Sequence, residues 1–368
     1  MADAGPLNVP LLDHWVNRAT VLRMTLPDGA HAALTNAVEA AVIPGGVAAR
    51  VDDAVRVDLV CAGVTRSGGD RVRPSTRYDL ASLTKVVATL PCILRLVSER
   101  AISLEDSVGR FFTNAGWFQQ PSLADASVRE LLTHTSGLPS WAPLFARVSH
   151  RQTALAAVLQ APVEEVGRVR YSDLGFMLLG AIVERVTGSR LDEAARDLVF
   201  GPLAMTRTSF GPIEPEDVAA TEDCGWRGRL LVGEVHDENA AVWDGVSGHA
   251  GLFSEVGDLA RYAAAWLSHD PLLGSAELLD EATSAQAQGD DGSVRGWGWA
   301  LPAAAAFAGA GARGFGHTGF TGTSVWIDPD GRAASILLTN RVHPRRDLGE
   351  GIHALRRTFH GAAHGREA

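Results

Sequence analysis

Hydrophobic residues recur at two spacings along the chain, and they predict strands near both ends with helices between them. From Val55 to Cys61 apolar and polar side chains alternate, which is the period-two pattern of a half-buried strand. From His31 to Val42 the apolar residues recur at helical spacing, until Pro44-Gly45-Gly46 breaks the pattern with a turn. The N-terminal part therefore combines a helix with an early antiparallel strand.

The middle of the chain has helical periodicity, and strand patterns return only near its end. Helices are expected over Ser82 to Glu99, Val128 to Thr133, Thr153 to Gln160, Leu174 to Thr187, Leu191 to Val199 and around Leu259 to Trp266. Late strands are expected over Gly296 to Leu301, Gly314 to Phe320, Thr323 to Ile327 and Ala333 to Leu338, with a closing helix over Leu348 to Phe359. The Ala- and Gly-rich stretch from Pro302 to Gly314 predicts a long connection between strands.

This order of elements predicts one antiparallel sheet assembled from the two ends of the chain. The expected fold is an α/β sandwich with an antiparallel sheet flanked by helices, plus an inserted mostly helical domain. We expect residues 1–88 and 271–368 to form the α/β domain and residues 89–270 to form the helical one. Binding clefts occur preferentially at the junction between two domains, so we expect the functional residues at this junction.

Composition and charge exclude several classes of protein. With 46% hydrophobic and 21% charged residues among 368, the chain has the balance of a globular protein with a large core. A formal charge of −10, without a Lys- or Arg-rich run, argues against nucleic acid as a partner. Cys61, Cys92 and Cys224 are odd in number and far apart, so free thiols are expected rather than a disulfide scaffold.

No segment predicts export or membrane insertion. From Met1 to Arg18 there is no basic start followed by an apolar core, so a cytoplasmic location is expected. The most apolar stretches, Val86 to Val97 and Phe176 to Val183, fall short of the roughly 20 residues that span a bilayer. The expected partner is a small-molecule substrate, with neither nucleic acid nor membrane, and no pattern indicates an oligomeric state.

Ser82 and Lys85 are the first candidates for chemistry. They lie at positions i and i+3 where a helix should begin, which puts the lysine amine within reach of the serine hydroxyl. A hydroxyl becomes a nucleophile when a neighbouring group takes its proton, and N–H groups at a helix start stabilise a developing oxyanion. Ser-x-x-Lys also occurs often as an N-cap serine followed by a surface lysine, so other motifs must decide.

Two further motifs supply such context. Tyr171 stands with Ser172 and Asp173 directly before an expected helix, where a nearby ammonium would favour its phenolate as a general base. Ser172 or Asp173 could equally cap that helix. His317-Thr318-Gly319 lies on an expected glycine-rich strand, whose edge could pair with a substrate and complete an oxyanion hole. The alternative is a strand histidine among glycines needed for twist and bulges.

In this order the motifs resemble those of the serine β-lactamase and penicillin-binding-protein-like hydrolase superfamily. The branch is that of class C β-lactamases, D-alanyl-D-alanine carboxypeptidases and related esterases, with Tyr-x-Asn and a His- or Lys-Thr-Gly in second and third place. Leu131 to Leu138 and Gly248 to Ser254 resemble two further family segments. The resemblance spans about Gly45 to Asn340 and implies the same α/β sandwich with a helical domain and the site between them.

The resemblance also implies roles for single residues. Ser82 would be the nucleophile that accepts the acyl group, Lys85 its proton partner and Tyr171 the general base and then acid. His317 would line the cleft beside Thr318 and Gly319. The backbone N–H groups of Ser82 and Phe320 would form the oxyanion hole, and His134 would shape a loop rather than react.

Asp173 departs from the family pattern. An ionised carboxylate accepts hydrogen bonds but cannot donate one to a substrate carbonyl as the family's Asn does, which puts β-lactam recognition in doubt. If Asp173 lies near Lys85, it should hold the lysine protonated and leave Tyr171 as the base.

The segment from Val235 to Ala241 resembles one in a subset of these hydrolases that includes bacterial enzymes acting on cell-wall fragments. Its His236, Asp237 and Glu238, with His249, could also be drawn as a metal site. Because the spacing fits no standard ligand pattern, we expect a hydrogen-bonded loop near the cleft, with no metal or cofactor. Five tryptophans are expected near the motifs, as core anchors or as a pocket floor: Trp141, Trp226, Trp243, Trp297 and Trp299.

The expected function is that of a serine hydrolase that forms an acyl-enzyme at Ser82 and hydrolyses a small ester or amide. A carboxylic ester and a muropeptide amide from the cell wall are both consistent with the motifs. The alternatives are a D-alanyl-D-alanine carboxypeptidase, a weak β-lactamase, a non-catalytic ligand-binding member of the fold and, last, a metal-dependent hydrolase using His236 and His249.

Overall fold

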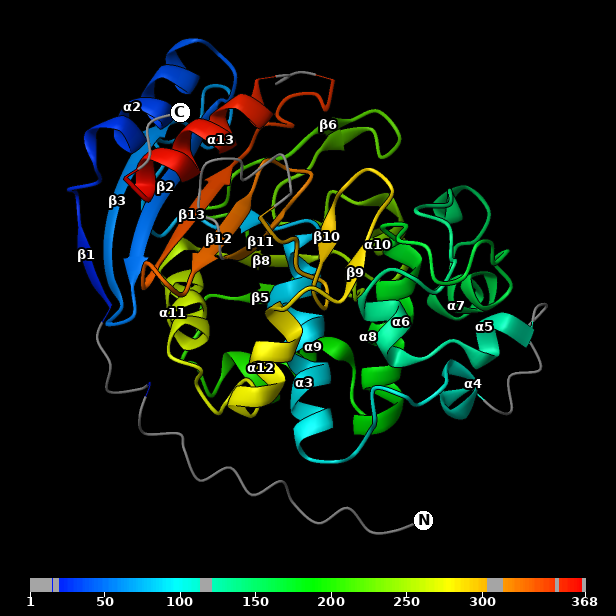
Figure 1. The fold of residues 1–368 in the computed structure, drawn as a ribbon. Coiled ribbons are helices and arrows are strands. Elements are labelled where there is room, and N and C mark those ends of the chain that lie inside the picture. The colour runs from blue at the N-terminus through cyan, green and yellow to red at the C-terminus, as the bar shows by residue number, and fades with distance from the viewer. Residues whose placement is uncertain (1–14, 16–19, 113–120, 303–313, 348–350, 366–368) are drawn as a thin grey trace.

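The computed structural model describes residues 15, 20–112, 121–302, 314–347 and 351–365. A six-stranded sheet lies at its centre, in the order β1-β3-β2-β13-β12-β11 (Figure 1). The strands are β1 (Val21–Arg23), β2 (Gly45–Asp52), β3 (Arg56–Gly63), β11 (Phe315–Thr318), β12 (Ser324–Asp328) and β13 (Ala333–Thr339). All neighbours pair antiparallel except β1 and β3, which run parallel, so the sheet is mixed.

The centre of the sheet joins the two ends of the chain. Strand β2 pairs with β13 over seven residue pairs, from Ala333 opposite Asp52 to Thr339 opposite Gly46. Side chains alternate between the two faces, so Val47 and Ala49 belong to one hydrophobic core while Ala48 belongs to another. Both faces are therefore buried.

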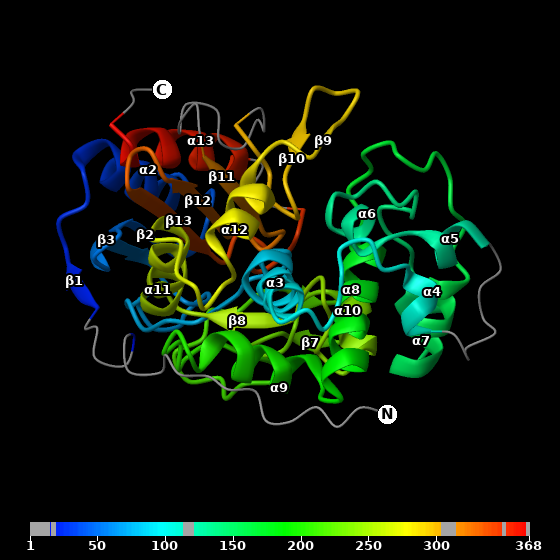
Figure 2. The same ribbon diagram turned by 60° about the horizontal axis from the view of Figure 1, so that its bottom comes forward.

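Helices cover the two faces of the sheet. Helices α2 (Asp28–Glu39) and α13 (Ile352–Ala363) pack together over one face, and α11 (Val256–Leu267) packs against β13 and β2 on the other (Figure 2). The smaller core lies under α2 and α13, and the larger core includes α11. The layers are those of an α/β sandwich.

The remaining helices gather beside the sheet around α8 (Asp173–Thr187), the longest described helix (Figure 1). The others are η1 (Lys85–Thr89), α3 (Leu90–Ser98), α4 (Val108–Phe111), α5 (Pro121–Asp125), α6 (Val128–Leu132), η2 (Leu144–Ala146), α7 (Arg151–Leu159), α9 (Leu191–Ala195), η3 (Arg196–Phe200), α10 (Glu238–Val242) and α12 (Ala276–Thr283). Short strands connect them: β4 (Tyr78–Asp79), β5 (Ser209–Phe210), β6 (Asp223–Cys224), β7 (Arg229–Leu230), β8 (Leu252–Ser254), β9 (Ala287–Gln288) and β10 (Val294–Arg295).

Most of the expected elements are confirmed, and one is wrong. The segment Gly296 to Leu301 forms no strand: Gly298 has a left-handed φ of 73°, and its N–H donates to Leu132 rather than to a neighbouring strand. The expectation also missed β2, because Gly45 and Gly46 lie inside the strand instead of ending a helix. Most of the connection expected from Pro302 to Gly314, and the start of the closing helix, lie outside the described residues.

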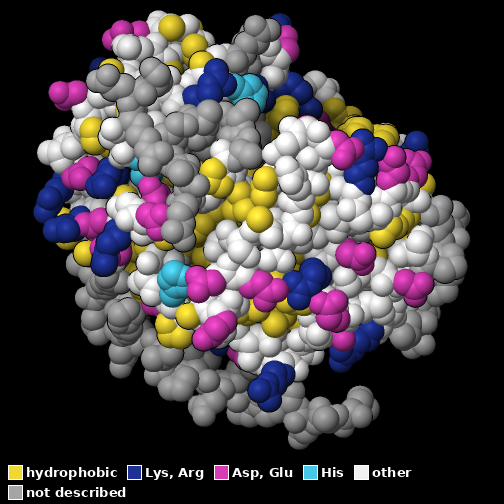
Figure 3. Space-filling view, in the orientation of Figure 1, with side chains coloured by type: hydrophobic (Ala, Val, Ile, Leu, Met, Phe, Trp, Pro, Cys, Tyr) yellow, Lys and Arg dark blue, Asp and Glu magenta, His cyan; other side chains and the backbone are white. Residues whose placement is uncertain are grey.

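The described residues also bear on the thiols, on membrane spans and on the distribution of surface charge. All three cysteines are free. Within the described ranges, no helix combines the length and apolar character that crossing a bilayer requires. On the face shown in Figure 3, acidic and basic side chains are interspersed, without a patch of one sign.

Candidate active site

A tight turn after β4 presents Ser82. The carboxylate of Asp79 accepts a hydrogen bond from the Ala81 N–H at 2.8 Å and thereby holds Ala81 at a φ of 46°, an uncommon conformation for a residue with a Cβ. Ser82 follows directly, and the helical turn then begins. From the opposite side, Thr321 and Thr323 donate from their hydroxyls to the carbonyls of Asp79 and Leu80, which fastens the sheet to this turn.

Lys85 is fully buried and is the only lysine in the chain. Its ammonium donates to Ser82 Oγ at 3.0 Å, to Asp173 Oδ1 at 2.7 Å and to the His249 carbonyl at 3.3 Å. Burial alone would lower the pKa of Lys85, but the charge of Asp173 and the neighbouring Tyr171 outweigh it and raise that pKa. The geometry thus agrees with the hypothesis that Asp173 keeps the lysine protonated.

Tyr171 lies at the centre of the cluster, just before α8. The Lys85 Nζ is 4.9 Å from the centre of its ring, and the rings of His134 and His317 are 4.7 Å and 5.9 Å away, centre to centre. Ser172 caps α8, because its Oγ accepts from the Gly175 N–H at 3.2 Å. The capping alternative therefore holds for Ser172, and the Asp173 carboxylate contacts the lysine.

His317 on β11 brings the third motif to the same place. Its Nδ1–H donates to the Thr318 carbonyl at 2.8 Å, so Nε2 is an acceptor, and this buried atom has no partner among the described residues. Burial, together with the charges of Lys85 and Arg295, holds the pKa of His317 well below its usual value. The histidine is therefore neutral at physiological pH.

Gly319 follows His317 and Thr318 where β11 meets the serine turn. A Cβ at Gly319 would lie 2.4 Å from the Leu80 carbonyl oxygen, so no larger residue fits this close approach. Neither the Phe320 N–H nor the Ser82 N–H donates to an acceptor in the described part of the chain, which leaves both available to an oxyanion.

His134 packs against the ring of Tyr171 and accepts a hydrogen bond from the residue that follows it. Its Nδ1 accepts from the Ser172 N–H at 3.1 Å, so the neutral ring carries its proton on Nε2, which is buried without a partner in the described residues. Burial and the charges of Arg295 and Lys85 keep the pKa of His134 well below its usual range. This placement is consistent with a residue that shapes the loop.

The segment around His236 forms a hydrogen-bonded network beside the site. His236 contacts Glu222 at 3.1 Å, and His249 donates to Asp237 at 2.9 Å, so the two histidines bond different carboxylates. Across the described residues, no three His, Cys, Asp or Glu side chains are grouped to hold a metal. The His236 N–H donates to Asp79 at 2.6 Å, which ties this network to the serine turn.

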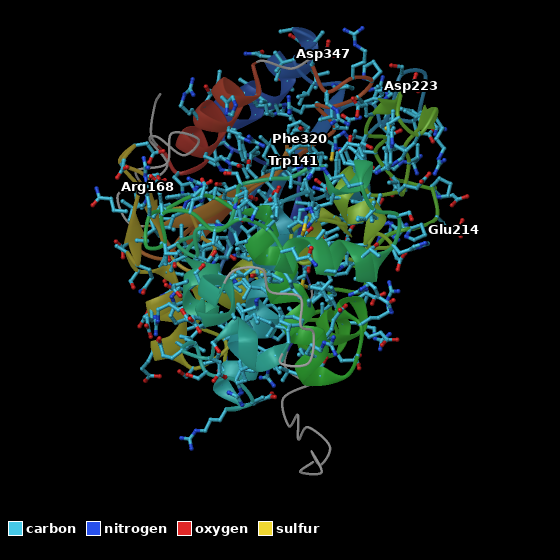
Figure 4. All side chains as sticks on the ribbon, turned by 90° about the vertical axis from the view of Figure 1, so that its right-hand side faces the viewer. Trp141, Arg168, Glu214, Asp223, Phe320 and Asp347 are labelled. Atoms are coloured by element: carbon cyan, nitrogen blue, oxygen red, sulfur yellow. The ribbon has the colours of Figure 1, made fainter. Side chains whose placement is uncertain are left out.

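Two kinds of residue near the site were missed or left open by sequence reasoning. Arg295 on β10 has its Cζ 5.5 Å from the Tyr171 ring centre, a contact between distant parts of the chain that no local pattern signals. The tryptophans divide: Trp243, Trp297 and Trp299 are buried, whereas Trp141 and Trp226 are about half exposed. Trp141 and the half-exposed Phe320 both lie near the middle of the face in Figure 4.

The layered sheet, the flanking helices and the serine–lysine–tyrosine cluster define a protein of the β-lactamase/transpeptidase fold. The chain belongs to the Beta-lactamase family, whose model matches residues 30–358. A relative from Salmonella gallinarum, named "Putative D-alanyl-D-alanine carboxypeptidase", is 32% identical over 314 residues, covering 74% of this chain and 71% of the relative.

Solved structures agree on the fold. EstCE1, described as a hydrolase with promiscuous acyltransferase activity, superposes with a TM-score of 0.74 at 21% identity, covering 92% of this chain and 98% of that one. A class C β-lactamase from Rhodobacter sphaeroides gives a TM-score of 0.69 at 17% identity, covering 92% and 99%. At such identities the likeness shows the fold alone.

Proposed function

We propose that the protein is a serine hydrolase that forms an acyl-enzyme at Ser82 and hydrolyses a small amide or ester. The observation that carries the proposal is the buried ammonium of Lys85, which donates to Ser82 Oγ at 3.0 Å while Asp173 holds it at 2.7 Å. A surface lysine after an N-cap serine would be exposed and mobile, whereas this one is fixed against the hydroxyl.

In the proposed reaction Tyr171 is the proton carrier. Lys85, which interacts with Tyr171 through its charge and a side-chain hydrogen bond, stabilises negative charge on the Tyr171 oxygen, and that oxygen takes the Ser82 proton as Oγ attacks the carbonyl carbon. The N–H groups of Ser82 and Phe320 receive the oxyanion. Tyr171 then gives its proton to the leaving group. In the second step water attacks the acyl carbon and gives a proton to Tyr171, the bond to Ser82 Oγ breaks, and Tyr171 returns that proton to Ser82 as the acid product leaves.

Among amides, we favour peptides that end in D-alanyl-D-alanine. The Salmonella relative's name supports this class, at 32% identity over most of both chains. Asp173 disfavours β-lactams, because its carboxylate is engaged by Lys85 and offers no N–H to a substrate carbonyl. Carboxylic esters are the second candidate, favoured by half-exposed Trp141, Trp226 and Phe320, which could contact an apolar acyl group.

Intact-protein mass spectrometry tests the nucleophile. We expect one adduct from a fluorophosphonate, and a slower one from a penicillin, on the parent chain but none on Ser82→Ala. Release of D-alanine from a peptide ending in D-Ala-D-Ala, compared with turnover of a nitrophenyl ester and of nitrocefin, then ranks the substrate classes. If neither reagent labels the parent chain, the acyl-enzyme proposal is wrong and the ligand-binding alternative takes its place.

A further inference from the structure

Arg356 on α13 is a buried guanidinium that forms no ion pair with a carboxylate of the described residues. Its side chain reaches the turn between β11 and β12, where Nη2 donates to the Gly319 carbonyl at 2.7 Å and to the Thr323 carbonyl at 2.9 Å. Only 4% of Arg356 is exposed, and its Nε has no hydrogen-bond partner in the described part of the chain. Because a charge buried against neutral carbonyls costs free energy, its position indicates a role beyond packing.

Helix α13 holds Arg356 in a fixed position. Leu355 and Phe359 on the same helix belong to the smaller core, which lies under one face of the sheet (Figure 2). One helical turn after Arg356, His360 Nε2 lies 2.8 Å from the Oγ of Ser324, the first residue of β12. The helix is therefore fastened to the strand that begins directly after the turn.

The Gly319 carbonyl belongs to the same peptide group as the Phe320 N–H, which is available to an oxyanion. This peptide bond is trans, so its C=O and N–H point in opposite directions. A guanidinium that holds the carbonyl toward α13 therefore directs the Phe320 N–H away from α13. The same carbonyl also accepts from the Gly322 N–H at 3.1 Å, a longer bond from a neutral donor. Because a charged donor polarises the peptide group more strongly, Arg356 makes the Phe320 N–H a better donor.

Arg341 provides a comparison within the same turn. Its Nε donates to the Phe320 carbonyl at 2.9 Å, and its Cζ lies 4.8 Å from the centre of the Phe320 ring. That carbonyl belongs to the next peptide group, whose N–H is that of Thr321. Arg341 therefore contacts the phenylalanine without acting on its N–H. Burial and the charge of Arg341 lower the pKa of Arg356 to about 10, so Arg356 is protonated at physiological pH.

We propose that Arg356 is a positioning residue that orients and polarises the Gly319–Phe320 peptide, so that the Phe320 N–H stabilises the oxyanion. The inference rests on acyl transfer at Ser82, the proposed function. Arg356 does not touch the substrate in this role. The polarised N–H gains most as the substrate oxygen becomes negative in the transition state, and less in the neutral ground state. The effect of Arg356 therefore falls on kcat rather than on KM.

Kinetics on a nitrophenyl ester and on its thionoester test this role. In Arg356→Gln, kcat on the ester should fall about 10- to 100-fold with little change in KM, because the oxyanion donor is weakened but not removed. Sulfur accepts hydrogen bonds weakly, so the thionoester depends less on the N–H. The ester-to-thionoester ratio of kcat/KM should therefore fall about tenfold.

Two further variants complete the comparison. Arg356→Lys keeps the charge but not the planar fork, so its ratio should lie between, and it takes the place of Arg356→Gln if circular dichroism shows that variant to be unfolded. Arg341→Gln removes an arginine from the same turn and is the matched control, whose ratio should equal that of the parent. Equal losses on the ester and the thionoester in the Arg356 variants would overturn the proposal.

Nuclear magnetic resonance observes this peptide group without turnover and so separates the inference from the proposed function. Labelling glycine with carbonyl ¹³C and phenylalanine with ¹⁵N selects three peptide groups: Gly175–Phe176, Gly314–Phe315 and Gly319–Phe320. In Arg356→Gln the third signal should move to lower carbonyl and amide chemical shifts, while the other two stay. An unmoved third signal would overturn the role of Arg356 even if Ser82 is acylated. A moved signal without acylation of Ser82 would contradict the proposed function and leave Arg356 as the group that polarises this peptide.

Discussion

Two histidine-containing clusters lie side by side in this molecule, and they differ in how completely their polar groups are satisfied. Around His249, Nε2 donates to Asp237 at 2.9 Å and Nδ1 lies 2.8 Å from Ser247 Oγ. None of the buried side-chain polar atoms in that network lacks a partner within the described residues. Around Tyr171, by contrast, His134, His317 and Arg295 each keep a buried nitrogen without one.

On the proposed function, the cluster with satisfied hydrogen bonds stabilises the fold, and the cluster around Tyr171 would meet the substrate. A buried polar group without a partner costs about 1–3 kcal/mol, so folded proteins keep few of them. Three around one ring are explained if a substrate completes their hydrogen bonds. The His249 network, whose hydrogen bonds are already made within the protein, stabilises the loop around His236 and Asp237.

Lys85→Met should have the largest effect. It removes the ammonium from Ser82 and leaves the partly buried Asp173 carboxylate without its cation. We expect the rate of fluorophosphonate labelling at Ser82 to fall by at least about 1,000-fold. This loss lies within the range that one general acid–base group typically contributes to a rate. Circular dichroism should show that the variant is folded. A folded variant labelled within tenfold of the parent rate would contradict the role of Lys85.

Asp237→Ala should have the opposite effect: it should lower the free energy of unfolding and leave the reaction at Ser82 nearly unchanged. The side chain of His249 and the Ala240 N–H lose their acceptor, and hydrogen bonds to a charged group of this kind contribute about 2 kcal/mol. Urea unfolding should report a free energy lower by that amount. The labelling rate at Ser82 should stay within about threefold; a greater loss would assign the network to the reaction.

Asp173→Asn should shift the pH dependence of the site. Without the carboxylate, burial dominates, and the pKa of Lys85 should fall. Because Lys85 is the only lysine, selective ¹³Cε-lysine labelling gives one signal whose titration reads this pKa directly. The alkaline limb of the labelling rate should move to lower pH by the same amount. An unchanged pH profile would count against Asp173 as the group that protonates Lys85.

His317→Asn should produce the smallest change, seen only in acid. The unfolded chain takes up a proton at each histidine as pH falls through about 6.5, whereas burial holds the pKa of folded His317 well below that value. The unfolded state then binds more protons, so the free energy of unfolding decreases as pH falls. Removing this histidine should make the free energy of unfolding less dependent on pH below about pH 6.5, the value of the unfolded histidine. Urea titrations at pH 5 and 7 measure it.

Local chemistry made much of this molecule predictable. The helix from Asp173 and the strand from Ala333 follow from periodicity, and the motifs at Ser82, Tyr171 and His317 stand out by residue type and order. Their meeting in space follows from the family resemblance rather than from spacing.

What escaped prediction depends on distant contacts. Gly45 and Gly46 signal a turn locally, but a Cβ at Gly46 would lie 2.6 Å from the Leu338 carbonyl oxygen, so the glycines serve the central strand pair. Arg295 gives no local signal, because its significance comes from Tyr171 far back in the chain. The cytoplasmic location, the domain boundaries and the absence of a cofactor stay predictions.

The single buried lysine gives the folded protein an unusual reactivity toward reagents that modify amines. Apart from the α-amino group, every amine-directed reagent finds one target, and that target is shielded while the chain is folded. Global opening exposes it, so the rate of modification at Lys85 counts the molecules that have unfolded. Modification of Lys85, the residue that serves the proposed chemistry, therefore reports conformational opening. Because Lys85 is shielded in the native protein, amine coupling to a surface would attach it through the α-amino group alone.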